Sequence, residues 1–192
     1  AVIGSGPGGY VAALEAAELG GKVVVIEKSP FVGGNCLSVG CIPSKAMLAS
    51  AELLHRVHTA NKLGIKVSGE ATADWPAIQA RKDKIIQGLR GGIGSLFKGR
   101  NVQLRQGLGS LDGKGRVVIK NGNDASVVTA TSIILATGSK PSLLPGISGT
   151  RVATTDTALH WDTLPASLLI IGGGIIGIEF ACMMQAFGVT GT

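Results

Sequence analysis

Continuous apolar runs that end in glycine-rich turns alternate along this chain with Ala- and Leu-rich runs of helical period. An apolar run without polar alternation is typical of a strand that is buried on both faces of a parallel sheet. Such runs predict strands over 1–3, 22–26, 132–136 and 168–171. The helical runs predict helices over 10–19, 46–63, 77–97 and 178–187. The pattern therefore favours an α/β fold.

The middle of the chain carries shorter strand signals that are separated by turn residues. Short strands are expected over 102–105, 116–120 and 126–129. Asp112-Gly113 and Asn121-Gly122 are pairs that favour tight hairpin turns. Gly107-Leu108-Gly109 interrupts this region, and a β-bulge is the simplest interpretation of it. A β-meander is therefore expected between the parallel strands.

The first predicted strand leads directly into a dinucleotide-binding pattern. Gly4, Gly6 and Gly9 form G-x-G-x-x-G, and the next predicted strand ends at Glu27. The first glycine makes the turn, the second lets backbone approach a pyrophosphate, and the third lets the helix pack closely on the strand. Glu27 has nearly the spacing at which a carboxylate binds ribose hydroxyls. A glycine turn without a ligand is the alternative, and the ordered strand, helix, strand and acid argue against it.

The same unit occurs a second time near the end of the sequence. An offset of 168 positions places Gly172, Gly174, Gly177 and Gly188 on Gly4, Gly6, Gly9 and Gly20. Two copies of the unit predict two bound dinucleotides and hence electron transfer between cofactors. The same offset maps Glu27 onto position 195, beyond Thr192, so the residue that would distinguish NAD from NADP is not in the sequence.

Cys36 and Cys41 are five positions apart. Glycines precede and separate them, and a proline follows. Zinc prefers C-x2-C pairs supplied twice, so metal binding is the weaker alternative, and two reduced core cysteines are another. A redox-active disulfide is favoured. Bridged Cα atoms lie within roughly 7 Å, which a regular helix does not allow at this spacing, and Gly40 permits the distorted turn that a bridge needs. A strained bridge is easier to reduce.

Composition narrows the function classes. The chain has 192 residues, of which 45% are hydrophobic, 16% charged and 30 are glycine, a balance that suits a folded α/β protein rather than disorder. The net charge of +6 is not clustered, because Arg81, Lys82 and Lys84 fall in a mixed segment with Asp83, which we predict to be a solvated helix face. Nucleic-acid binding is not expected.

The remaining cysteine and the histidines are assigned packing or surface positions. Cys182 lies on an apolar helix face and is expected in the core. His55 and His58 could offer two metal ligands, but no third candidate accompanies them, so no metal site is expected. The most apolar run, 168–178, is cut by glycines and too short to cross a bilayer, so no membrane span is expected. Three cysteines do not make a disulfide scaffold, and a cytoplasmic location is expected.

The segment GGNCLSVGCIPSKAML resembles the redox segment of the flavin-dependent pyridine nucleotide–disulfide oxidoreductases. Its IPSKAML part is most similar to the dihydrolipoamide dehydrogenase branch of that family, and the resemblance covers essentially the whole chain. Asn35 and Ser38 stand where the commonest pattern has Thr and Asn. Mercuric reductase or another flavin disulfide reductase is the alternative within the class. A nucleotide-binding module with inert cysteines is the alternative outside it.

The resemblance implies roles for individual residues. Cys36 would exchange with the substrate, and Cys41 would face the flavin and form the charge-transfer thiolate. Lys45 would lie near the flavin N5, Glu27 would bind the adenosine ribose of FAD, and Glu179 would contact the nicotinamide end of NAD. The further FAD contacts would be Gly4, Gly6, Pro7, Gly8, Gly9, Lys28, Gly34, Asn35, Gly109, Ala136, Thr137 and Gly138. The further NAD contacts would be Gly172, Gly174, Ile175, Ile176 and Gly177.

The resemblance also implies a fold and an activity. It implies a Rossmann-like FAD-binding domain with a β-meander insertion over 1–145, and the first βα unit of a second, truncated Rossmann-like domain that binds NAD over 146–192. The activity would convert dihydrolipoamide and NAD into lipoamide and NADH through the Cys36–Cys41 disulfide and FAD. The lipoamide would be carried by the acyltransferase (E2) component of a 2-oxoacid dehydrogenase complex.

In this family a homodimer is formed, and the catalytic base is a His paired with Glu in a C-terminal interface domain of the partner subunit. None of His55, His58 and His160 lies in such a motif. The 192-residue stretch alone is therefore expected to be inactive. The expected location is the cytoplasm, or the mitochondrial matrix if the source is eukaryotic.

Overall fold

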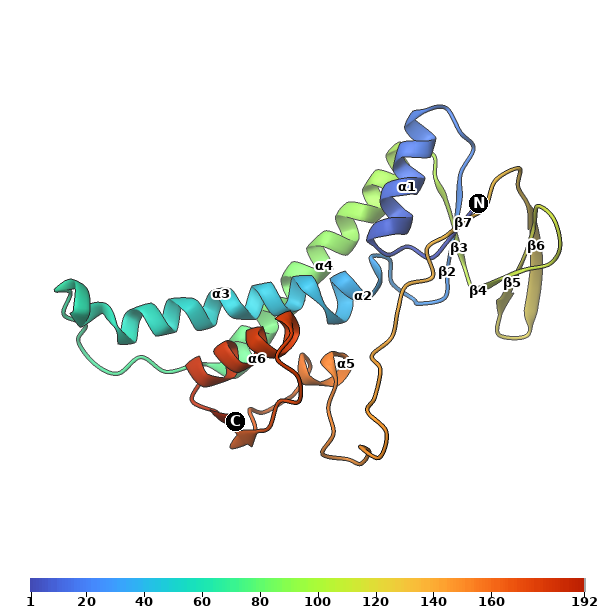
Figure 1. Ribbon diagram of the computed structural model, residues 1–192. Coiled ribbons are helices and arrows are strands. Elements are labelled where there is room, and N and C mark those ends of the chain that lie inside the picture. Colours follow the sequence, from blue (N-terminus) through green and yellow to red (C-terminus); the bar gives the residue numbers. More distant parts are fainter. Residues whose placement is uncertain (192) are drawn as a thin grey trace. The chain divides into compact units, whose positions relative to one another are not determined.

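Residues 1–191 are described by a computed structural model, and they divide into two compact units (Figure 1). Unit 1 consists of Ala1–Ser38 and Gln87–Ser142. Unit 2 consists of Val39–Ile86 and the chain from Leu143 onward. Each unit is defined only by contacts among its own residues, and this division does not test the predicted domains. An FAD-binding domain over 1–145 and the start of an NAD-binding domain over 146–192 therefore stay predictions.

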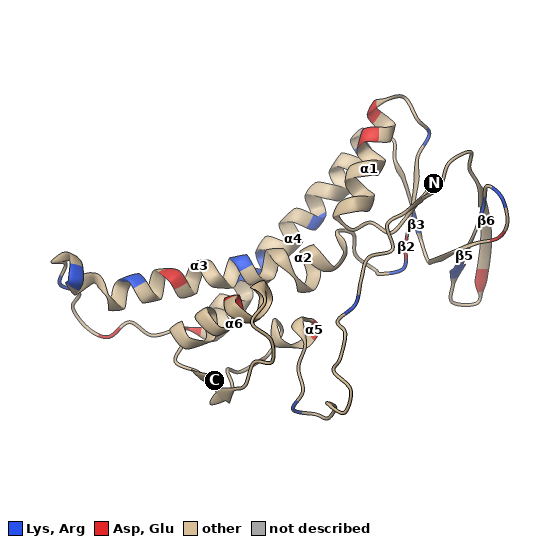
Figure 2. Ribbon diagram, viewed as in Figure 1, with Lys and Arg blue, Asp and Glu red and all other residues tan. Residues whose placement is uncertain are grey.

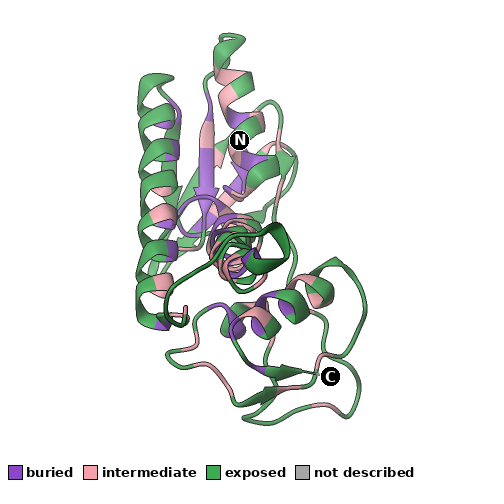
Figure 3. Ribbon diagram, turned by 90° about the vertical axis from the view of Figure 1, so that its left-hand side faces the viewer, coloured by how far each residue is buried: buried purple, intermediate pink, exposed green. Residues whose placement is uncertain are grey.

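The centre of unit 1 is a parallel sheet with the strand order β3-β2-β1-β7. Its strands are β1 (Val2–Ile3), β2 (Val24–Glu27), β3 (Gln103–Gln106) and β7 (Ile134–Leu135). Val2 pairs with Val25 and with Ile134, which fixes the register of β2 and β7 on either side of β1. The residues of β1 and most of β2 are buried, which explains why these segments are continuously apolar. Figure 3 shows buried ribbon near the N-terminus. Both residues of β7 are exposed, so the expected burial is wrong for that strand.

Helix α1 (Pro7–Glu18) joins β1 to β2 and begins before the predicted range of 10–19. Proline is favoured at the first position of a helix, because its fixed φ suits the helix and its missing N–H would have no partner there. The glycine turn is therefore shorter than expected, and its last two glycines, Gly8 and Gly9, already belong to the helix.

An antiparallel three-stranded sheet with the order β4-β5-β6 completes unit 1. Its strands are β4 (Leu108–Leu111), β5 (Arg116–Asn121) and β6 (Asp124–Thr129). The interpretation of 107–109 as a bulge is wrong, because Leu108 and Gly109 belong to a regularly paired strand. Ile3 and Ile26 of the parallel sheet form a core with Val117 and Ile119 of β5, so the two sheets share apolar contacts.

The cysteine segment is helical on both sides of one interruption. Helix α2 (Gly34–Val39) is followed by Gly40 and then by α3 (Cys41–His58). Gly40 has φ −138° and ψ −115°, values that no regular helix contains. The predicted helix over 46–63 therefore begins earlier, at Cys41, and ends at His58, after which Ala60–Leu63 forms the 3-10 helix η1.

Unit 2 is built on the packing of α3 against α6 (Ile175–Ala186). Its other elements are the 3-10 helix η1, the first half of α4 (Trp75–Gly99), helix α5 (Thr155–Ala158), and the parallel strands β8 (Ser167–Leu168) and β9 (Thr190–Gly191). Met47 and Ala51 of α3 contact a core that includes Phe180 and Met183 of α6. Trp75 meets Phe187 edge to face, with ring centroids 5.7 Å apart.

The predicted solvated face on α4 is wrong for Lys82. Its side chain is 1% exposed, and its Nζ donates to the backbone carbonyl of Leu159 at 2.9 Å. Arg81 donates from Nη1 to the carbonyl of Ala46 at 2.7 Å, whereas Lys84 is exposed. A buried ammonium needs hydrogen-bond acceptors, and the carbonyl supplies one. Elsewhere the Lys and Arg residues are dispersed along the ribbon (Figure 2).

One helical stretch, Gly34–His58, is long and apolar enough to cross a membrane by length and composition alone. The most apolar run of the sequence, 168–178, lies elsewhere in the chain and is too short to span a bilayer. Core helices of globular proteins meet the same criterion, and Met47 and Ala51 of this stretch do pack in the core of unit 2. The finding is weak evidence for a membrane, and the location of the protein stays a prediction.

Candidate functional site

The first glycine turn is closed by contacts that leave no room for side chains. Gly4 has φ +100°, and a Cβ on it would lie 2.1 Å from the carbonyl oxygen of Ala136. A Cβ on Gly9 would lie 1.9 Å from the oxygen of Gly4. These two glycines and Ala136, all predicted from the sequence, are therefore brought together where β1, α1 and β7 meet.

Glu27 is the hydrogen-bonding centre of this turn. Its Oε2 accepts from the backbone N–H of Ser5 at 2.8 Å and from the Ser5 hydroxyl at 2.6 Å, and its Oε1 accepts from the N–H of Ser29 at 2.8 Å. The residue is 6% exposed. A carboxylate has about four acceptor positions, so this one retains capacity for a further donor such as a hydroxyl. Sequence reasoning missed Ser5, whose position between two glycines of the motif was the available signal.

The second glycine turn repeats the backbone of the first. Gly172 has φ +110°, and a Cβ on Gly177 would lie 2.1 Å from the oxygen of Gly172. Gly6 and Gly174 are the N-cap residues of α1 and α6, with ψ −178° and 178°. Neither helix N-terminus is capped by a side chain, and neither helix has an acidic residue in its first turn. The predicted internal repeat is confirmed at the level of backbone angles.

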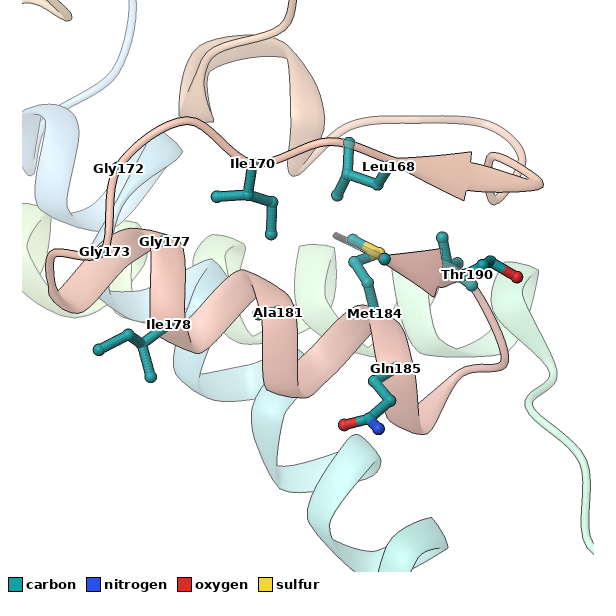
Figure 4. A pocket seen from close by; sticks show the side chains of 12 residues that line it. Leu168, Ile170, Gly172, Gly173, Gly177, Ile178, Ala181, Met184, Gln185 and Thr190 are labelled. Atoms are coloured by element: carbon teal, nitrogen blue, oxygen red, sulfur yellow. The ribbon is translucent and has the colours of Figure 1, made fainter.

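A cavity of about 660 Å³ lies beside the second turn, between the β8 segment and α6 (Figure 4). Figure 4 shows Leu168, Ile170 and Met184 directed toward one another across it, while Gly172 and Gly177 border one end. The walls are mainly apolar, so the cavity itself offers little to a phosphate. The glycine backbone at its end is the polar part.

Cys36 lies on α2 in unit 1 and is partly exposed. The segment before it is attached to the first glycine turn. Gly33 donates its N–H to the carbonyl of Ser5 at 3.0 Å, and a Cβ on Gly34 would lie 2.6 Å from the Cα of Gly6. Substitution at either end of this approach would therefore displace both the turn and the cysteine segment.

Cys41 is the first residue of α3, in unit 2, and it is exposed. Ser44 donates its hydroxyl to the Cys41 carbonyl at 3.1 Å, one turn into the helix. The pairing of Cys41 with Cys36 stays a prediction. Cys182, expected in the core, is instead exposed on α6, so that expectation is wrong. The helix turns its Phe180, Met183 and Met184 inward instead.

Lys45 and Glu179 form an ion pair between α3 and α6. Their side chains are 59% and 24% exposed, so water reaches both charges. The residue implied for the flavin site and the residue implied for the nicotinamide site are thus in direct contact. Sequence reasoning named both residues but had no signal for their contact.

The other predicted site residues take varied positions. Asn35 donates from Nδ2 to the carbonyl of Ser139, and a Cβ on Gly109 would lie 3.1 Å from the side chains of Ile3 and Ile26. The predicted residues Lys28, Thr137, Gly138, Ile175 and Ile176 are exposed. Within residues 1–191, no group of three or more His, Cys, Asp or Glu side chains is placed to hold a metal ion.

Comparison with known proteins gives consistent matches. The model of the family described as pyridine nucleotide-disulphide oxidoreductase matches residues 1–192. The chain is 42% identical to a dihydrolipoyl dehydrogenase of Chlamydia muridarum over 97% of this chain and 40% of the relative. It is 39% identical to that of Bacillus subtilis over 98% of this chain and 42% of the relative. The chain thus spans about two fifths of the length of these curated relatives.

A solved structure also resembles this chain. It is the HOCl-induced flavoprotein disulfide reductase RclA from Escherichia coli, determined as its Cu(II) complex. The TM-score is 0.81 and the sequences are 25% identical, over 99% of this chain and 40% of that one. The expected α/β fold with a Rossmann-like dinucleotide-binding arrangement is therefore confirmed. With a family model that covers the whole chain and a repeated dinucleotide-binding turn, the chain belongs to the pyridine nucleotide-disulphide oxidoreductase family.

Proposed function

We propose that the whole protein is a dihydrolipoamide dehydrogenase, which oxidises dihydrolipoamide with NAD through a Cys36–Cys41 disulfide and FAD. The observation that carries the proposal is the interruption of the helix at Gly40, between the two cysteines. An uninterrupted helix would hold residues five apart too far apart for a disulfide. The names of the curated relatives support the choice of substrate.

The residues of the first glycine turn fit an FAD pyrophosphate and ribose. The N-terminus of α1 presents backbone N–H groups and the positive end of the helix dipole, and no side chain caps it. A Cβ on Gly8 would meet nothing within 4 Å, so the approach is open. Glu27 would accept from ribose hydroxyls while Ser5 and Ser29 hold its carboxylate in place.

The N-terminus of α6 fits the pyrophosphate of NAD for the same reasons. No side chain caps this helix at its N-cap residue, Gly174. A Cβ on Gly173 or Gly174 would meet nothing within 4 Å. Glu179 would lie toward the nicotinamide end, where its carboxylate pairs with Lys45. The chemistry that bound FAD and NAD supply is transfer of an electron pair from the dithiol, the last step of it as a hydride.

The thiol chemistry follows from the exchange of one disulfide for another. A thiolate of dihydrolipoamide would attack the Sγ of Cys36, form a mixed disulfide, and release Cys41 as a thiolate. The second substrate thiol, after loss of its proton to a base, would attack the substrate sulfur bound to Cys36. That step closes the lipoamide ring and releases Cys36, which takes up a proton. The substrate loses two electrons and the cysteine pair gains them.

The same proposal includes the partners. The lipoamide would be attached to the acyltransferase component of a 2-oxoacid dehydrogenase complex, and the protein would be a homodimer whose partner subunit provides the base. The location would be the cytoplasm, or the mitochondrial matrix in a eukaryote. The names of the curated relatives support a lipoamide-linked role, and they do not specify the acyltransferase partner, the homodimer or the location.

The proposal is tested on the full-length protein with dihydrolipoamide and NAD in a steady-state assay. We expect turnover that falls at least a hundredfold in Cys36→Ser and in Cys41→Ser, since each removes one sulfur of the pair. Cys182→Ser is the matched control and should retain wild-type turnover, because Cys182 is an exposed cysteine outside the segment. Absence of lipoamide turnover together with Hg(II)-dependent nicotinamide oxidation would instead identify a mercuric reductase.

A further inference from the structure

The helix that carries Cys36 is weakly fixed by its own backbone. Gly33 and Gly34, which lead into α2, have φ +104° and +61°, and Gly40, which ends it, has the irregular angles given above. Glycine restricts the chain less than any other residue, so glycines on both sides of a short helix leave its orientation to outside contacts. The position of Cys36 therefore depends on what touches α2 and the residues before it.

Several contacts within unit 1 supply part of this restraint. Leu37 is buried, and Gly33 donates to the backbone of Ser5. Asn35 donates to the carbonyl of Ser139. These contacts hold the start of α2 and its inward face, and none of them involves Ser38, near the end of the helix.

Arg90 of α4 contacts the cysteine segment on both flanks. Its guanidinium carbon lies 4.0 Å from the ring centroid of Phe31, before the cysteine. Its Nη2 donates to the hydroxyl of Ser38 at 3.0 Å, after the cysteine. Planar guanidinium groups stack on aromatic rings and donate hydrogen bonds in fixed directions, so a single side chain can restrain two points of a backbone.

The Nε nitrogen of this guanidinium is shielded from water. Nε of Arg90 is buried and has no hydrogen-bond partner within the described residues. A buried donor without a partner is unfavourable, so the contacts with Phe31 and Ser38 must offset its cost for the side chain to stay in this position. Arg90 is placed for those two contacts and not for optimal hydrogen bonding of its own.

We propose that Arg90 is a positioning residue for Cys36, because it holds Phe31 and Ser38 on the two flanks of the cysteine and so fixes α2 for thiol–disulfide exchange. The inference rests on the proposed function of the cysteine pair. A displacement of about 1 Å at a reacting group can reduce a rate by roughly a hundredfold, and here other contacts share the restraint, so we expect about a tenfold effect.

The test uses the full-length protein and two activities. The first is lipoamide-linked turnover, which requires Cys36. The second is NADH oxidation with an external one-electron acceptor such as ferricyanide, which requires the flavin and the nicotinamide site but not the cysteine pair. In Arg90→Met, we expect kcat of the first activity to fall about tenfold with KM unchanged. The second activity and the flavin content should remain within twofold of wild type.

Matched variants separate positioning from general stability. Arg90→Lys should recover part of the lipoamide rate, because an ammonium can still bind the Phe31 ring and the Ser38 hydroxyl. Ser38→Ala removes one contact with a minimal change and should give a smaller, selective loss. Arg100→Met is the control, since Arg100 is in the same unit and pairs with Glu18, away from the cysteine segment.

Three results would overturn the inference. Arg90→Met could keep its lipoamide rate within twofold of wild type. It could lose both activities in proportion to its flavin content, with Ser38→Ala and Arg90→Lys equal to wild type, which is the behaviour of a merely structural residue. Arg100→Met could show the same selective loss. Failure of the proposed function itself would look different, because the wild-type protein would then lack lipoamide turnover altogether.

Discussion

Lys45 and Glu179 form an ion pair although 134 positions separate them in the sequence. Lys45 stands in the first turns of the helix that begins with Cys41, and Glu179 stands in the helix that begins at the second glycine turn. The pair joins the cysteine helix to the proposed nicotinamide-binding helix within unit 2.

This ion pair should contribute little to stability. Both charges are in contact with water, and exposed pairs contribute about 0–1 kcal/mol. In a double-mutant cycle with Lys45→Met and Glu179→Gln, urea unfolding should give a coupling free energy below about 1 kcal/mol, which decreases as salt is added. In either single variant, kcat of the full-length protein should fall by a factor that corresponds to more free energy than the unfolding free energy loses. A coupling of several kcal/mol would show that the pair is a folding element.

Glu27→Gln should weaken both the first glycine turn and FAD binding. The new amide would place an N–H₂ group against at least one of the three donors that now bind the carboxylate. Buried donors without acceptors cost about 1–3 kcal/mol, so the free energy of unfolding should fall by that amount. FAD affinity should fall at least tenfold. Glu18→Gln, at an exposed position, is the control and should change neither measurement.

Substitution in one glycine turn should abolish binding of one dinucleotide and leave binding of the other intact. Gly9→Ala places a Cβ 1.9 Å from the oxygen of Gly4, and Gly177→Ala places one 2.1 Å from the oxygen of Gly172. Backbone must move in each case, at a cost of about 3 kcal/mol or more. Calorimetry of full-length variants should show lost FAD binding in the first and lost NAD binding in the second.

The neighbouring glycines provide matched controls for these variants. A Cβ on Gly8 or Gly173 would meet nothing within 4 Å. Gly8→Ala lies in the first turn of α1, and alanine favours a helix over glycine by up to about 1 kcal/mol. Its thermal unfolding temperature should therefore be unchanged or raised. Equal destabilisation in Gly8→Ala and Gly9→Ala would contradict the steric explanation.

Lys82→Met should lower the free energy of unfolding more than a substitution in a charged stretch of sequence usually does. It removes the donor to the Leu159 carbonyl and the contact with His160, both inside unit 2. An unsatisfied buried carbonyl costs about 1–3 kcal/mol, and urea unfolding should show a loss of that size. Lys84→Met, two positions away and exposed, should stay within about 0.5 kcal/mol of wild type.

The sequence predicted local patterns well and contacts between distant residues poorly. The strands β1, β2 and β7 and both glycine turns follow from continuous apolar runs and from glycines at fixed spacing, which are local signals. Strand β4 was missed because Gly107 and Gly109 suggested a bulge, whereas close packing on Ile3 and Ile26 explains the glycine at 109.

The same limit applies to side chains. Lys82 is surrounded by charges in the sequence, but the fold places an acceptor, the Leu159 carbonyl, 77 positions away against it. Cys182 lies among apolar neighbours, yet the helix turns Phe180 and Met183 inward instead. In the candidate site, glycines and cysteines were identified from their spacing. Ser5 lies between two glycines of the motif, which was a local signal for it. The contacts of Ser38 and Arg90 with the cysteine segment depend on tertiary structure and left no such signal.

The redox state of Cys36 and Cys41 tests the account most directly. The full-length flavoprotein is alkylated under denaturing conditions before and after reduction by dihydrolipoamide, and the labelled peptides are identified by mass spectrometry. The account predicts that Cys36 and Cys41 are protected before reduction and both labelled after it, while Cys182 is labelled in both samples. Equal labelling of Cys36 and Cys41 in the two samples would contradict a redox-active disulfide.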